Sequence, residues 1–187
     1  MNGFDILIML FFGGIVALAF FGGLGKVFST TVGLYFGVVF AAFFYHPLAV
    51  AVAHVLPSMA LFTGDLLMFV LLLALSTVGF SAALARTFVL GRFPAWLGAF
   101  NNVSGGVVGI LVATFATILA AMVVALTVQV LDHTAAAQTS GFLGVVHDQM
   151  RGAALVPIFL KLVPTFVTPL HPWFPKGLPP ILAPGSY

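Results

Sequence analysis

Residues 66–85, LLMFVLLLALSTVGFSAALA, contain no charged side chain and are bounded by Asp65 and Arg86. A bilayer core of roughly 30 Å is crossed by about 20 helical residues. A charge placed at the centre of that core costs at least ~2.5–3.5 kcal/mol. The stretch therefore predicts a membrane-spanning helix over about residues 65–85.

The same pattern extends to both sides of this stretch. Charge-free runs also cover residues 6–25, 27–64 and 93–131. The run 27–64 is too long for one span and too short for two spans with a turn, which leaves an interfacial segment at 48–62. The three further spans are expected at about 5–23, 28–46 and 102–130.

The composition places the whole chain in the membrane class. It is 62% hydrophobic and only 5% charged, with a mean hydropathy of +1.24, whereas soluble domains carry about 25% charged residues. Six Lys and Arg residues cannot form the basic face that nucleic-acid binding requires. The absence of cysteine excludes disulfides, thiol catalysis and iron–sulfur ligation.

The predicted fold is an all-α integral membrane protein with four transmembrane helices in residues 1–131. Residues 132–187 are expected to form an extramembrane or interfacial Pro-rich tail, since eight of the eleven prolines lie between Pro157 and Pro184. This density prevents a straight spanning helix. Trp173 and Lys161 are expected to anchor the tail at the interface, and the last residues, from Lys176, are expected to be extended.

Basic residues in short loops indicate the orientation. Lys26 lies between the first two spans, and Arg86 and Arg92 lie between the last two. By the positive-inside rule, both turns are cytoplasmic and both termini are extracytoplasmic. Three basic residues in the tail favour the opposite orientation, although long segments after the last span respond weakly to the rule.

Small residues recur at every fourth position in the second and fourth predicted spans. This spacing places them on one helix face, where they let backbones approach closely in lipid. The face either packs within the monomer, joins copies of the chain, or docks another subunit. The predicted helix-packing residues are Gly33, Gly37 and Ala41, with Gly105, Gly109 and Ala113.

Few residues are candidates for chemistry. Asp132–His133 and His147–Asp148 form two dyads that could bind a metal or perform acid–base catalysis. Their spacing matches no zinc-binding helix motif, and they lie in a polar stretch where solvated side chains are expected. We therefore predict no catalytic residue, no metal site and no cofactor.

The remaining ionisable residues lie at the ends of the predicted spans. Asp5 and Asp65 begin spans and are interpreted as N-caps. His46, His54 and His171 could ligate haem or chlorophyll, but each is terminal rather than mid-span. The absence of charge within the spans argues against proton pumping, ion coupling and voltage sensing.

These motifs together resemble the colicin V production protein (CvpA-like) family of bacterial inner-membrane proteins. The resemblance covers nearly the whole chain: Asp5 opens the first span, Gly25 and Lys26 precede the second, and proline marks the tail at Leu155-Val156-Pro157, Pro169 and Pro172. At the entry to the last span, Asn101-Asn102-Val103-Ser104-Gly105 is followed by Gly109. The chain departs from the family pattern there, because Asn101 and Asn102 stand where the family has an acidic–basic pair.

The resemblance implies a non-enzymatic inner-membrane scaffold or factor associated with the envelope and with colicin V production, a toxin biosynthetic process. Some family members carry an extracytoplasmic protease after the four spans, which implies an extracytoplasmic tail. One alternative is an accessory subunit of a respiratory or photosynthetic membrane complex. Another is a small transporter or channel component. The expected partners are the lipid bilayer, with other membrane subunits or a second copy of the chain, and no nucleic acid.

Overall fold

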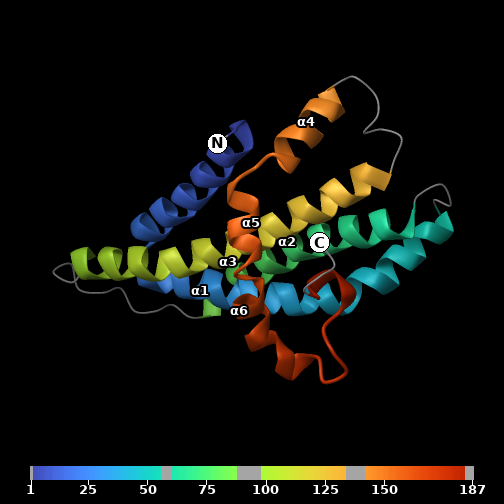
Figure 1. Ribbon diagram of the computed structural model, residues 1–187. Coiled ribbons are helices and arrows are strands. Elements are labelled where there is room, and N and C mark those ends of the chain that lie inside the picture. Colours follow the sequence, from blue (N-terminus) through green and yellow to red (C-terminus); the bar gives the residue numbers. More distant parts are fainter. Residues whose placement is uncertain (1, 56–59, 88–97, 134–141, 184–187) are drawn as a thin grey trace.

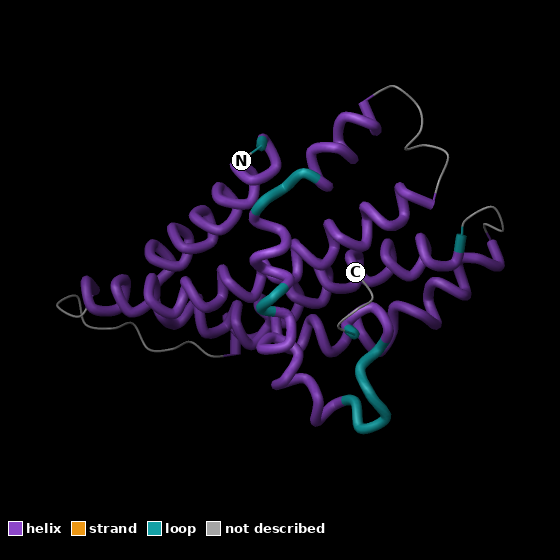
Figure 2. The backbone as a smooth tube through the Cα atoms, viewed as in Figure 1, coloured by secondary structure: helices purple, strands orange, loops and turns teal. Residues whose placement is uncertain are grey.

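Every regular element in the described part of the chain is helical (Figure 2). The computed structural model describes residues 2–55, 60–87, 98–133 and 142–183. The elements are α1 (Gly3–Val55), α2 (Leu61–Thr87), α3 (Gly98–His133), α4 (Phe142–Arg151), α5 (Leu155–Leu160), α6 (Val163–Val167), and the 3-10 turns η3 (Thr168–Trp173) and η4 (Pro180–Leu182).

Three helices in the described residues are long and apolar enough to cross a membrane, not the four that the sequence predicted. The predicted spans 5–23 and 28–46 both lie in α1, which is 53 residues long. Gly23 interrupts α1 with φ 72° and ψ 171°, outside the helical region. The two halves of α1 run in different directions, the first in dark blue and the second in lighter blue (Figure 1).

The number of helices differs because the chain needs only one residue to change direction there. Glycine adopts a positive φ at little cost, since it has no Cβ. The residues on both sides of Gly23 remain helical.

The expected interfacial segment at 48–62 is also not a separate element. Residues 48–55 continue α1 beyond Pro47, and residues 61–62 begin α2; residues 56–59 lie outside the described structure. A proline removes one backbone donor from a helix, but neighbouring groups often compensate for that loss in membrane proteins.

The long helices form a bundle in which α1 is central. The second half of α1 packs antiparallel to α2, and α3 lies against both halves of α1 (Figure 1). Val112 of α3 packs in one cluster with Ala19 from the first half of α1 and Val27 from the second half.

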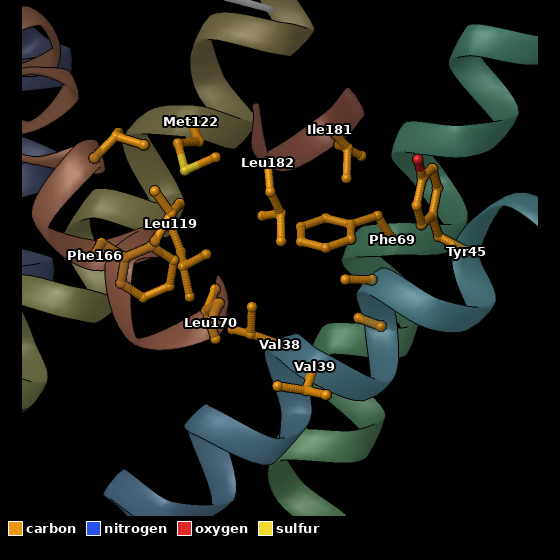
Figure 3. Close-up of a cluster of buried hydrophobic side chains, with 14 of the residues drawn as sticks. Val38, Val39, Tyr45, Phe69, Leu119, Met122, Phe166, Leu170, Ile181 and Leu182 are labelled. Carbon is orange, nitrogen blue, oxygen red and sulfur yellow. The ribbon is translucent and has the colours of Figure 1, made fainter. Parts of the chain in front are cut away.

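The Pro-rich tail packs on this bundle instead of forming a separate unit. Val163, Leu170 and Leu182 are 0–1% exposed and share one core cluster with side chains of α1, α2 and α3. Figure 3 shows Phe166 and Leu170 beside Leu119 and Val38, and Ile181 and Leu182 near Phe69 and Tyr45. The tail therefore shares a core with the long helices, and η4 lies where extended chain was expected.

Candidate functional site

The contact between α1 and α2 depends on two of the predicted packing glycines. A Cβ added to Gly33 would lie 2.8 Å from the Ser81 backbone nitrogen, and one added to Gly37 would lie 3.0 Å from that of Thr77. Ser76 Oγ donates a hydrogen bond of 3.2 Å to the Gly37 carbonyl oxygen. Ala41, one turn further along α1, is fully buried. Backbone atoms thus approach closely along this face.

The second set of glycines packs α3 against the first half of α1. A Cβ on Gly105 would lie 2.8 Å from the Gly23 carbonyl carbon and 2.9 Å from the Ala19 oxygen. A Cβ on Gly109 would collide with the Ala19 side chain. Ala113 is fully buried one turn later. Both predicted small-residue faces are therefore used within the monomer.

Asn101, a predicted motif residue, lies at the interruption of α1. Its Oδ1 accepts a hydrogen bond of 3.0 Å from the Leu24 backbone N–H. The side chain also occupies the space that a Cβ on Gly23 would need. Asn101 therefore caps the second half of α1 from α3, where a capping oxygen satisfies an orphan helix donor. Asn102, the next residue in α3, is partly exposed.

Asp5 joins the N-terminus to the tail. Its carboxylate accepts hydrogen bonds of 2.9 Å from the backbone N–H groups of Asn2 and Leu155, and its side chain is fully buried. The N-cap role expected for Asp5 belongs to Asn2, whose Oδ1 accepts from the backbone N–H groups of Phe4 and Asp5 at 3.1 Å. Asn2 Nδ2 also donates to the Gln149 backbone oxygen at 2.6 Å.

A second polar contact ties the tail to the second half of α1. Tyr35, in the second half of α1, donates its hydroxyl to the Pro169 carbonyl oxygen at 2.9 Å. Trp173 Nε1 donates to the same hydroxyl at 2.8 Å. Trp173, expected to be an interfacial anchor, is thus tied to a helix of this chain.

The predicted dyads come together in part. His147 Nε2 lies 2.9 Å from Asp132 Oδ1, and His147 Nδ1 lies 3.5 Å from Asp148 Oδ1. Arg151 Nη1 lies 3.7 Å from the same Asp132 oxygen. Only 9% of the His147 side chain is exposed. The side chain of His133 lies outside the described structure.

This arrangement suits an electrostatic contact between α3 and α4 better than acid–base catalysis. A general base needs a ring nitrogen within hydrogen-bonding reach of the proton that it removes. Both nitrogens of His147 face carboxylate oxygens of the chain itself. The described residues hold no group of three His, Asp or Glu residues placed to bind a metal ion.

The remaining candidates lie apart from this cluster. His46 Nδ1 lies 3.0 Å from Asp65 Oδ1 across the α1–α2 contact. Asp65 is not an N-cap, because α2 begins earlier, at Leu61. His54 lies in the last turn of α1, and His171 is exposed in η3.

Two cavities border α3 at Val112. The larger, of about 230 Å³, lies between the halves of α1 and includes Lys26 and Thr30 in its lining. The smaller, of about 80 Å³, extends past Tyr35 to the tail residue Phe166. No His or Asp of the described chain lines either cavity.

Sequence reasoning missed the residues that attach the tail, namely Asn2, Tyr35 and Gln149. Tyr35 carries one detectable signal, a phenol hydroxyl within an apolar run, since such a group needs a partner when it is removed from water. Asn2 and Gln149 carry no comparable signal, because their partners lie far away in the sequence.

No protein-family model, no curated protein and no solved structure matches this chain.

Proposed function

We propose that this protein is a non-enzymatic scaffold of the bacterial inner membrane, of the CvpA-like type, with a role in the envelope and in colicin V production. The observation that supports it best is that three buried polar side chains have hydrogen-bond partners within the chain. The buried polar side chains of the described structure are Asp5, Ser29, Thr117 and His147. Asp5 and His147 bond to other elements of this chain, whereas Ser29 bonds to the Gly25 carbonyl oxygen one turn earlier in α1. Asp5 and His147 thus support a role in holding the bundle together rather than in lining a reaction site.

Four crossings of the membrane are part of this proposal. At 1.5 Å per residue, α1 would extend about 80 Å if straight, against a bilayer core of about 30 Å. The interruption at Gly23 allows each half of α1 to cross once. With α2 and α3, this gives the four spans that the CvpA-like resemblance implies.

The distribution of charge supports the orientation with both termini outside. Lys26 follows the interruption of α1, and Arg86 lies in the last turn of α2, one turn beyond the Ser81–Gly33 contact. Asp132, by contrast, lies near the other end of α3, where Arg151 is 3.7 Å from its Oδ1. Basic residues between spans favour the cytoplasmic side.

The tail completes the scaffold by entering the bundle. It runs from Leu155, beside Asp5, reaches Tyr35 through Pro169, and returns toward Tyr45 at Ile181. Broken helices at membrane depth are tolerated where protein surrounds them. Here the tail side chains pack in the same core as the long helices.

Extraction of the protein from native membranes in a mild detergent, followed by mass spectrometry of co-migrating proteins, tests the proposal. A stand-alone scaffold migrates as one copy or as a homo-oligomer, or with envelope proteins. Stoichiometric co-migration with redox or light-harvesting subunits would replace it with the accessory-subunit function.

A further inference from the structure

The larger cavity opens between the two halves of α1 toward the lipid-facing surface of the bundle. Leu18, which lines it, is 72% exposed, so the mouth of the cavity is open to the surroundings. Ile15, Val27 and Val112 provide further apolar walls. Empty cavities with apolar walls remain dry, so a bilayer would fill this one with hydrocarbon.

One cationic side chain, that of Lys26, lines this cavity. Lys26 is exposed, and its aliphatic stem passes within 3.0 Å of the position that a Cβ on Gly22 would take. The described residues place no carboxylate against its ammonium. Lysine commonly packs its stem on apolar surface while its charged head stays in water or among headgroups.

A second, smaller cavity also has Val112 in its lining, together with Leu34 and the tail residue Leu170. A cation at the larger apolar cavity matches an amphiphile that has an anionic head and a hydrocarbon chain. Basic pockets between transmembrane helices on the cytoplasmic side bind anionic lipid headgroups in this way.

We propose that this larger cavity binds one anionic phospholipid, with its phosphate on Lys26 and one acyl chain between the halves of α1. Lys26 provides the preference for a net negative headgroup, and the apolar walls provide affinity for the chain. The inference concerns a ligand of the bundle and does not depend on the scaffold function.

Native mass spectrometry of the full-length protein in a mild detergent tests the site. The protein is titrated with phosphatidylglycerol and, separately, with phosphatidylcholine carrying the same acyl chains. We expect the wild type to bind one phosphatidylglycerol in preference to phosphatidylcholine. A basic residue near a membrane surface contributes about 1 kcal/mol, so Lys26→Met should weaken phosphatidylglycerol binding about five-fold and leave phosphatidylcholine binding unchanged.

Two further variants separate the site from general attraction of anionic lipid. Arg86→Met removes the same charge at the same end of the bundle, outside the cavity lining, and should preserve the preference, as should Lys26→Arg. Thr30→Phe fills the cavity and should lower binding of both lipids, with far-UV circular dichroism as the folding control.

Equal loss of phosphatidylglycerol binding in Lys26→Met and Arg86→Met would overturn the proposal, since it would show only diffuse attraction. Equal binding of the two lipids by the wild type would overturn it too. Unchanged binding by a folded Thr30→Phe variant would show that the lipid does not occupy the cavity and would overturn the proposal. If that variant does not fold, the two substitutions of the exposed Lys26 still decide the outcome.

Discussion

Replacing Gly33 by alanine adds one methyl group at the α1–α2 contact, where that methyl meets backbone atoms. The added Cβ would lie 2.8 Å from the Ser81 nitrogen and 3.0 Å from the Ser81 Cα. A flexible side chain could move away from it, but the backbone of α2 cannot do so without separating the helices. Gly79, on the exposed side of α2, provides the matched control, because a Cβ there has nothing within 4 Å.

The expected free energies follow from two opposing effects. Alanine in place of glycine stabilises a helix interior by about 1 kcal/mol, and this contribution is common to both variants. Overpacking a close contact costs about 1–3 kcal/mol, and only Gly33→Ala incurs it. The two variants should therefore differ by about 1–3 kcal/mol in the free energy of unfolding, with Gly79→Ala the more stable.

Unfolding by sodium dodecyl sulfate in mild-detergent micelles, followed by far-UV circular dichroism, measures this difference. The wild type should lie about 1 kcal/mol below Gly79→Ala, and level with Gly33→Ala or above it. If Gly33→Ala and Gly79→Ala unfold at the same detergent fraction, the close approach of α1 and α2 is not as described, and the packing argument fails.

The same titration checks three further predictions. Tyr35→Phe should destabilise the protein by about 0.5–1.5 kcal/mol, because Trp173 Nε1 loses its acceptor in an exposed contact; an unchanged tryptophan emission maximum would count against the docked tail. Asn101→Ala should cost about 0.5–2 kcal/mol through loss of the cap on the Leu24 N–H, and Asn101→Asp should retain most of that stability. Gly23→Ala should be destabilising, because φ 72° strains any residue with a Cβ; a neutral effect would refute the interruption of α1 at this residue.

The charge pattern of the sequence located two of the helix ends. Arg86 lies in the last turn of α2, and α3 extends just beyond Asp132, close to the boundaries that these charges predict. Burying a charge in lipid is costly, so a charge marks a helix end where one is present. The end of α1 at Val55 and the start of α2 at Leu61 fall within the charge-free run 27–64 and carry no such mark. Charges do not reveal how a helix changes direction, and the geometry at Gly23 therefore turned four expected helices into three.

The tail could not be predicted, because its contacts are distant in sequence. Phe166 contacts Phe115, with ring centroids 5.7 Å apart, and Tyr35 holds Pro169. Proline density shows that a segment cannot form a straight spanning helix. It does not show whether the segment lies on the membrane or enters a bundle, because that depends on which long-range partners exist.

The sequence identified the polar candidate residues by their type, but it did not identify the contacts that these residues make. Asp132 and His147 were both named from the sequence, and the structure brings them together. Asp5 was expected to cap its own helix, whereas it holds the backbone of Leu155. A carboxylate at a helix start fits either role, and only the folded tail distinguishes them.

Labelling of single cysteines in intact cells tests the central claim, the double crossing of α1, most directly. The natural chain has no cysteine, so Gly3→Cys, Lys26→Cys and His54→Cys each carry one reactive site. With a membrane-impermeant maleimide, we expect positions 3 and 54 to react from outside and position 26 to react only after the inner membrane is permeabilised. Reaction of positions 3 and 26 from the same side would contradict the account.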